Sequence, residues 1–169
     1  MAPDASAIKT VPKKQERELP VPPDVWEELH GYYFEDLEVG MSAVLSRTVQ
    51  GGDITALAGI SGDTNPLHTS DEFAANTIVE GRIAHGVLTA SYISALIGTR
   101  LPGPGCLYVS QSLRFKGPVR AGDTVNTRVT VTGLDDEKGR CIMWCECFVG
   151  HTLILEGEAV VQVTRRNPD

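Results

Sequence analysis

The sequence predicts an α+β domain in which an antiparallel sheet wraps around one long buried helix. The helix is predicted at 87–97, which holds no charged residue and carries apolar or small side chains at every helical position. A helix without a polar stripe must be enclosed by other elements. After residue 105 the chain is a succession of β-prone stretches separated by turn signals, which is typical of antiparallel strands. A buried helix beside such strands indicates the α+β class.

The remaining elements follow from local signals. A strand is predicted at 41–49 and is ended by two glycines. Asp53 then serves as the expected N-cap of a short apolar helix. Thr69 and Glu72 have the spacing of a capping box, so we expect a further helix to begin at Ser70. The later strands are predicted at 106–115, 124–134, 140–150 and 151–166.

The first 30 residues differ from the rest of the 169-residue chain. They contain five of the ten prolines, none of the seventeen glycines and the densest charge. Such a segment buries too little apolar surface to offset its ordering entropy. We therefore expect residues 1–30 to form an extended, flexible arm, with Val25 and Trp26 as a possible anchor, and residues 31–169 to form one domain.

Charge and hydropathy exclude several classes of function. The formal net charge of −7 argues against a dedicated nucleic-acid binder. The charged N-terminus lacks the apolar core of a secretion signal. The uncharged stretch 86–99 is too short to span a bilayer. We expect a cytoplasmic protein with neither a nucleic-acid nor a membrane partner.

Three of the four cysteines cluster in CIMWCEC, at 141–147. In a strand, Cys141, Met143, Cys145 and Cys147 share one face, as small core residues do. A metal site is the alternative interpretation, but the spacing does not fit the familiar zinc frameworks. We expect reduced thiols that fill the core.

The candidate site lies in SGDTNPLH, at 61–68, and AHG, at 84–86. Asn65-Pro66 excludes a regular helix, and the implied turn brings Asp63 and His68 toward one point. A carboxylate and an imidazole together supply a base and an acid near neutral pH. The Gly86 N–H begins the buried helix and is suited to stabilise an oxyanion. The alternatives are a turn cap for Asp63 and a surface role for His68.

Other kinds of site fit less well. Ser61 and Ser91 lack a nucleophile elbow. The glycines of LPGPGC alternate with prolines and open no helix, so they form no dinucleotide loop. Asp63, His68 and His85 would need a defined second shell to bind a metal. We expect no metal and no cofactor.

Three segments carry a family resemblance: SGDTNPLHTSDEFAA, IAHGVLTASYIS and LRFKGPVRAGDTV. In order and spacing they resemble the MaoC-like hydratases of the hot-dog fold, and among these the (R)-specific enoyl-CoA hydratases. The resemblance extends from about residue 33 to 165. It implies a catalytic pair, Asp63 and His68, with Gly86 as the oxyanion donor. It further implies supporting roles for Asn65, Ser94 and His85.

The resemblance also implies the reaction, which is reversible syn hydration of trans-2-enoyl-CoA to (R)-3-hydroxyacyl-CoA. The coenzyme A thioester is the substrate, and the domain is expected to pair as a homodimer or a dimer-based higher oligomer. Ser94 and Ile97 are the acyl-tunnel candidates. An acidic chain needs a local basic patch for the coenzyme phosphates. The candidates are Arg82, Arg100, Arg114, Lys116 and Arg120.

Three alternative functions remain at this stage. Two are enzymes with the same catalytic pair: a 3-hydroxyacyl-carrier-protein dehydratase, or a hydratase of a branched or dicarboxylic enoyl-CoA. The third is a non-catalytic acyl-CoA-binding regulatory domain. The presence of both Asp63 and His68 favours an enzyme.

Overall fold

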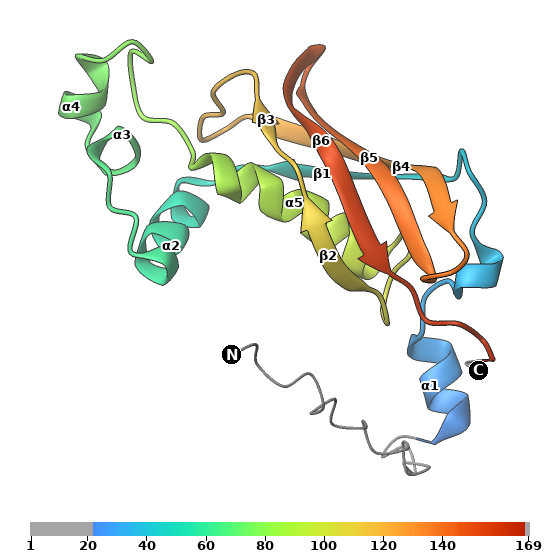
Figure 1. Cartoon of the computed structure of the whole chain (residues 1–169). Helices are drawn as coiled ribbons and strands as arrows, with labels where there is room; N and C mark the ends of the chain where they lie inside the picture. The colour runs from blue at the N-terminus through green and yellow to red at the C-terminus, as the bar shows by residue number, and fades with distance from the viewer. Residues whose placement is uncertain (1–21, 168–169) are drawn as a thin grey trace, which may run out of the picture.

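A single curved antiparallel sheet holds one long helix, α5 (Gly86–Thr99), against its inner face (Figure 1). This computed structural model describes residues 22–167. The predicted α+β class and the packing of the sheet around a central helix are confirmed. Residues 1–21 of the proposed N-terminal arm lie outside the described residues, so the prediction of a flexible arm stays open there.

The sheet has six strands in the order β1-β4-β5-β6-β2, with β3 also paired to β6, and every pairing is antiparallel. The tight turns predicted from the sequence connect β4 to β5 and β5 to β6. The strands are β1 (Ser42–Thr48), β2 (Leu107–Gln111), β3 (Arg114–Phe115), β4 (Thr124–Asp135), β5 (Arg140–Val149) and β6 (Thr152–Gln162).

The stretch 106–115 was predicted as one strand and is in fact two, β2 and β3. The break lies at Ser112, whose backbone passes very close to Gly157 in the middle of β6. A Cβ on Gly157 would stand 1.9 Å from the Ser112 carbonyl oxygen, so only glycine permits this approach. This close approach depends on a residue far along the chain, and the local pattern of 106–115 does not encode it.

The helix α5 is covered on one face only. Its buried side chains include Leu88, Tyr92 and Leu96, which pack on the sheet. Ser91 and Ser94 lie on the opposite face and are exposed. The expectation that other elements enclose the helix on all sides is therefore wrong for the single chain, because one curved sheet can cover only one side of a helix.

The cysteines of β5 behave as predicted. Side chains along this strand alternate between buried and half-buried, and the buried set faces α5. Its members are fully buried, and all the cysteines are free thiols. They fill the core as small apolar side chains, and the buried set is Cys141, Met143, Cys145 and Cys147.

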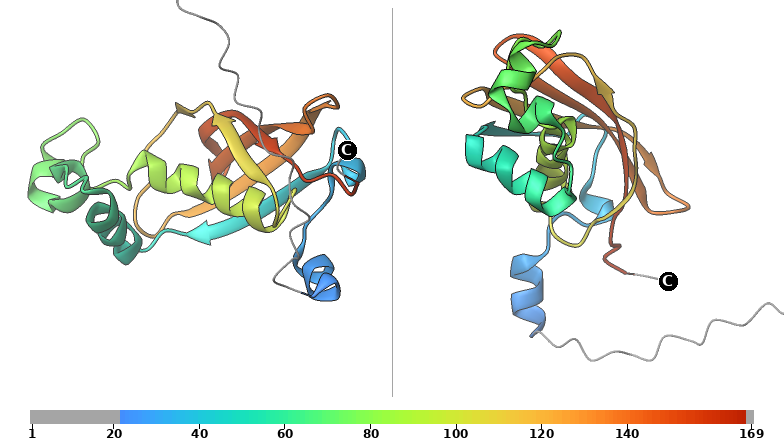
Figure 2. Two further views of the ribbon diagram at one scale, coloured as in Figure 1. Left: turned by 60° about the horizontal axis from the view of Figure 1, so that its bottom comes forward. Right: turned by 90° about the vertical axis from the view of Figure 1, so that its left-hand side faces the viewer.

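Three short helices lie beyond the N-terminal end of α5 and away from the sheet (Figures 1 and 2). They are α2 (Gly51–Ser61), α3 (Pro66–Thr69) and α4 (Asp71–Ala75). The predicted N-cap Asp53 is instead the third residue of α2, where its carboxylate accepts from the Gln50 N–H at 2.9 Å. The α4 helix exists as predicted, but Ser70 caps it by accepting from the Phe73 N–H.

Residues 23–29 form a helix, α1 (Pro23–Leu29), and not the extended arm predicted for this segment. Pro23 at the first helical position suits a helix start. A short 3-10 helix, η1 (Phe34–Asp36), follows, and the Tyr33 hydroxyl donates to the Glu27 carboxylate at 2.9 Å. His30 stacks on Tyr33 with 4.2 Å between ring centroids. These contacts join α1 to the start of the domain.

None of the helices in residues 22–167 has the length and apolar character needed to cross a membrane.

Candidate active site

Asp63 is held in a loop built from side-chain caps. The α2 helix ends at Gly62, which adopts the left-handed conformation at φ 77°. The Asp63 N–H donates to the Ser61 hydroxyl at 3.1 Å, and the Asp63 carboxylate accepts from the Asn65 N–H at 3.2 Å. Asn65 then caps α3 by accepting from the Leu67 N–H. The sequence SGDTNP thus fixes the backbone around Asp63, whose side chain is half-exposed.

His68 lies on α3, and one of its ring nitrogens is hydrogen-bonded to the main chain. Its Nδ1 is 2.8 Å from the Ile83 carbonyl oxygen. A carbonyl only accepts, so Nδ1 carries the hydrogen in the neutral ring and Nε2 has a free lone pair. His68 can therefore accept a proton at Nε2 without losing the contact that orients its ring.

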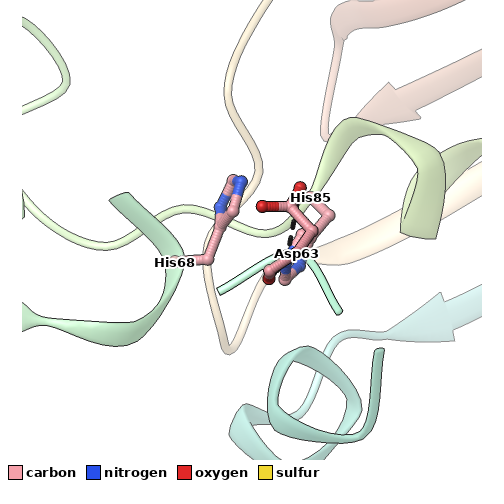
Figure 3. A group of neighbouring side chains, drawn as sticks. All are labelled: Asp63, His68 and His85. Atoms are coloured by element: carbon pink, nitrogen blue, oxygen red, sulfur yellow. Dashed lines mark hydrogen bonds and ion pairs between the residues drawn. The ribbon is translucent and has the colours of Figure 1, made fainter. Parts of the chain in front are cut away.

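His85 directly precedes α5 and is almost completely buried, with 1% exposure. Its Nε2 donates to the Asp63 backbone carbonyl at 2.9 Å and lies 3.9 Å from the Asp63 carboxylate. Its ring centroid is 3.8 Å from that of His68. Figure 3 shows the three side chains converging from three separate segments of the chain.

The three residues open onto a cavity of about 540 Å³. Its walls are mostly apolar, and its polar groups are the Asp63 carboxylate, the two imidazoles, the Lys116 side chain and the first residues of α5. Apolar walls with a few converging polar groups are typical of a small-molecule site. The wall residues not yet described are Val79, Ile83, Ala84, Val87, Thr89, Phe115, Lys116, Gly117, Pro118, Val119, Ile154 and Leu155.

Gly86 lies in the wall of this cavity as the first residue of α5. Its N–H is among the first amides of the helix, which have no acceptor within it, and the helix dipole favours negative charge there. A Cβ at this position would stand 2.7 Å from the Phe115 ring. Glycine therefore lets Phe115 pack directly over the helix start, beside the proposed oxyanion donor.

A family model described as "MaoC like domain" matches residues 36–143, which is more than half of the chain. The chain belongs to the MaoC-like domain family. The resemblance seen in three sequence segments is confirmed, and so is the hot-dog fold that it implies.

Individual relatives agree with this assignment. The chain is 51% identical over 140 residues to an (R)-specific enoyl-CoA hydratase of Rhodospirillum rubrum, covering 83% of this chain and 97% of the relative. It is 49% identical over 139 residues to a 3-hydroxybutyryl-CoA dehydratase of Methylorubrum extorquens, covering 82% and 88%. The solved (R)-hydratase from A. caviae, involved in PHA biosynthesis, superposes with a TM-score of 0.74 at 44% identity, covering 76% and 98%.

This MaoC-like domain brings together part of the site expected from the sequence. Asp63, His68, His85 and Gly86 line one cavity. Asn65 orients the loop as a helix cap and does not line the cavity. Two residues expected farther along α5 are not brought to it, Ser94, which is exposed on the uncovered face, and Ile97, which is fully buried in the core.

Two wall residues were missed by sequence reasoning. Thr89 is buried one turn after Gly86, and the spacing of three residues on a helix predicts a shared face. Phe115 belongs to β3, which pairs with β6, and its own neighbours in the sequence carry no signal that it lines the cavity.

The basic candidates of the MaoC-like domain differ in their contacts. Arg120 donates to the backbone carbonyls of Val79 and Arg82, which engages its guanidinium within the protein. Arg100 follows the far end of α5 and donates to the Val44 carbonyl. Neither is well placed to bind a phosphate near the cavity.

The other three basic candidates differ in their ion pairs. Arg82 pairs with Asp71 at 2.7 Å. Lys116 lines the cavity and pairs with Glu156 at 2.8 Å. Arg114 is exposed, directly precedes Phe115 and makes no ion pair with any residue in 22–167.

Asp63, His68 and His85 could together hold a transition-metal ion, because one ligand atom from each lies within 4.8 Å of the others. The His68 Nδ1–H donates to a backbone carbonyl and leaves Nε2 free, an arrangement that metal-ligating histidines also show. The same arrangement orients the ring for proton transfer, so the chemistry of the donors fits either use.

Proposed function

We propose that this protein hydrates trans-2-enoyl-CoA to (R)-3-hydroxyacyl-CoA, in fatty-acid metabolism. The observation that carries the proposal is the convergence of the Asp63 carboxylate, the free Nε2 of His68 and the Gly86 amide on one cavity. The relatives named as an (R)-specific enoyl-CoA hydratase and a 3-hydroxybutyryl-CoA dehydratase support the same reaction and its stereochemistry.

In the proposed mechanism, Asp63 and His68 bind one water molecule. The water oxygen bonds to C3 of the substrate as one of the water protons passes to this pair. The pair delivers a proton to C2 on the same face, so it ends in its starting protonation state. The two groups exchange protons as one coupled unit. The thioester oxygen gains negative charge during the addition and returns to a carbonyl as C2 is protonated. The Gly86 N–H stabilises that charge.

The test is hydration of crotonyl-CoA, followed as loss of the enoyl absorbance. Asp63→Asn and His68→Ala should each lower kcat by about 10²–10⁴-fold, the contribution typical of general acid-base catalysis. Asp136→Asn and His151→Ala change the same residue types on the exposed surface, outside the cavity, and should keep the activity. Normal turnover by both site variants would refute the assignment. An (S) product, detected with an (R)-specific dehydrogenase, would refute the stereochemistry.

The reaction needs only proton transfer and charge stabilisation, so we propose that it requires no metal or other cofactor. Protein dialysed against EDTA should keep its full crotonyl-CoA hydration rate. Loss of activity that returns with Zn²⁺ or Fe²⁺ would instead favour metal binding by Asp63, His68 and His85.

The acyl carrier also needs an experiment, because carrier-protein and coenzyme A thioesters would react at the same pair. A panel of enoyl-CoA chain lengths, branched and dicarboxylic enoyl-CoAs and an enoyl-carrier protein separates the enzyme alternatives. We expect the highest kcat/KM with an unbranched enoyl-CoA. Binding of acyl-CoA without turnover of any substrate would favour the regulatory-domain alternative.

We propose that Arg114, Lys116 and Arg82 contact the coenzyme A phosphates. Arg114 is exposed, and its side chain makes neither a hydrogen bond nor an ion pair within residues 22–167. Arg114→Ala should raise KM for crotonyl-CoA but not for crotonyl-pantetheine, which lacks the nucleotide phosphates. Arg100→Ala is the matched control and should change neither. Equal effects on both thioesters would refute a phosphate contact.

We also propose a homodimer, formed along the β2 edge and the uncovered face of α5. The β2 strand ends the sheet, and its Leu107, Tyr108 and Val109 are exposed. An unpaired apolar edge strand is a template for pairing with a second strand. The exposed face of α5 is rich in small side chains, such as Ser91 and Ser94.

Light scattering on the purified protein should give twice the monomer mass. Val109→Pro removes a backbone donor from β2 and should shift the mass toward the monomer. A monomeric wild type would refute the dimer. In the dimer, Ser94 would lie at the interface, and we retain Ser94 and Ile97 as acyl-tunnel proposals, tested by the chain-length preference of Ser94→Leu and Ile97→Ala.

Finally, we propose that the protein acts in the cytoplasm, because its four cysteines are free thiols and three of them are buried. Cell fractionation with an antibody to this protein checks the compartment.

A further inference from the structure

We propose that His85 is a positioning residue that sets the location of the Asp63 carboxylate through the Asp63 backbone. This inference rests on the proposed hydratase function and adds a residue to it. His85 transfers no proton in the mechanism above and acts through its contacts with both members of the catalytic pair.

The first contact is a hydrogen bond to the main chain. The His85 Nε2–H donates to the Asp63 carbonyl oxygen at 2.9 Å, across 22 residues of sequence. Asp63 itself lies on an exposed loop that local caps shape but do not attach to the domain. The bond from His85 fastens this loop to the start of α5, so the carboxylate and the Gly86 amide keep a fixed separation.

The second contact is with His68. The two ring centroids are 3.8 Å apart with an angle of 31° between the ring planes. The His68 ring is thus enclosed on one side by His85, while its Nδ1 is bound to the Ile83 carbonyl. One buried side chain therefore contacts both catalytic residues and directly precedes Gly86.

The tautomer of His85 follows from the same geometry. A hydrogen is required on Nε2, because its partner is a carbonyl oxygen. Its Nδ1 is buried and has no hydrogen-bond partner within residues 22–167. A buried imidazole nitrogen without a partner is costly.

The experiment separates the hydrogen bond from the ring stack. In His85→Gln the amide nitrogen takes the place of Nε2, so the donor is kept and the ring is lost. In His85→Phe the ring is kept and the donor is lost. We expect His85→Gln to keep kcat for crotonyl-CoA within about threefold, whereas His85→Phe lowers kcat by about 10–100-fold, the scale of a 1 Å misplacement of a reacting group. KM should change by less than threefold in both.

Two measurements distinguish positioning from general damage. Thermal unfolding should show that the variants are folded at the assay temperature. A long-range ¹⁵N spectrum should show the His68 Nδ1–H tautomer in the wild type and in His85→Phe, because Ile83 still accepts from it. If His85→Phe does not fold, His85→Asn replaces it, since its shorter amide cannot reach the Asp63 carbonyl.

The outcomes are distinguishable from failure of the proposed function. A wild type without hydratase activity would refute that function. An active wild type with full kcat in His85→Phe or His85→Asn would overturn the positioning role alone. Loss of kcat in His85→Gln with retention in His85→Phe would assign the effect to the stack and overturn the proposed hydrogen-bond mechanism.

Discussion

Replacing Gly157 with alanine would place a methyl group inside the closest approach of two backbones in the sheet. The new Cβ would lie 1.9 Å from the Ser112 carbonyl oxygen and 2.7 Å from its carbonyl carbon. That is about 1.5 Å short of an ordinary van der Waals contact. Both atoms belong to the main chain, so no side-chain rotation can relieve the overlap.

The magnitude follows from what must move. Separating the strands strains the hydrogen bonds that Ser112 forms with Glu158, one from its N–H and one to its hydroxyl, each 2.9 Å long. Overpacking costs about 1–3 kcal/mol, and a strained hydrogen bond adds about 1 kcal/mol, so we expect a loss near 3 kcal/mol. For a chain of this size that lowers Tm by about 6–12 °C.

The assay is thermal unfolding of Gly157→Ala followed by circular dichroism. Gly133→Ala is the matched control, because a Cβ there would meet only the Ile142 side chain, at 3.4 Å. We also expect a lower kcat for crotonyl-CoA, since Phe115, which packs against Gly86, follows Ser112 by three residues. A Tm within about 2 °C of the wild type, or an equal loss in Gly133→Ala, would show that the close approach of Ser112 to β6 does not depend on glycine.

Three further predictions concern the cavity, the core and the N-terminal contacts. Gly86→Ala should lower kcat for crotonyl-CoA at least about tenfold, because its Cβ would displace the Phe115 ring. Phe115→Ala in the same chain should restore part of the rate. A Gly86→Ala enzyme with unchanged kcat would contradict this. Burial raises the pKa of three core thiols, to about 12 for Cys141, about 12 for Cys145 and about 11 for Cys147. At pH 8 a thiol reagent should therefore label at most one cysteine per chain before denaturant is added. Rapid labelling of all four would contradict the packing. The Tyr33 N–H, and then Arg166, hold the pKa of the Asp36 carboxyl below its ordinary 3.8, so its stabilising effect is present above about pH 4 and is lost as the pH falls through the folded-state pKa. Urea unfolding should therefore show that Asp36→Asn has a lower free energy of unfolding than the wild type at pH 7, and that this difference disappears in acid. A difference that does not change with pH would rule out this linkage.

The convergence of Asp63 and His68 on one cavity was predictable from the sequence because their geometry is local. Asp63 and His68 are five residues apart, and Asn65-Pro66 between them allows few backbone paths. The caps found in the structure are made by residues within that same segment. Gly86 was predictable for a similar reason, since the uncharged run after it marks a helix start.

The basic residues were less predictable, because a charge in the sequence carries no information on its partner. Arg120 and Arg100 donate to carbonyls that lie 38 to 56 residues away along the chain. Only the fold brings those carbonyls into reach. Arg114 differs from them because its side chain makes neither a hydrogen bond nor an ion pair within residues 22–167, and no local pattern marks that difference.

The sequence by itself determined the α+β class, the buried face of β5 and the loop that carries Asp63 and His68, because each depends on spacing between neighbours in the chain. The tertiary structure alone decided that α5 is covered on one face, that Ser112 passes close to Gly157 and that His85 reaches the Asp63 carbonyl. The physical reason is the range of the interactions. Strand, cap and turn preferences act over a few residues, whereas close packing joins segments that lie tens of residues apart.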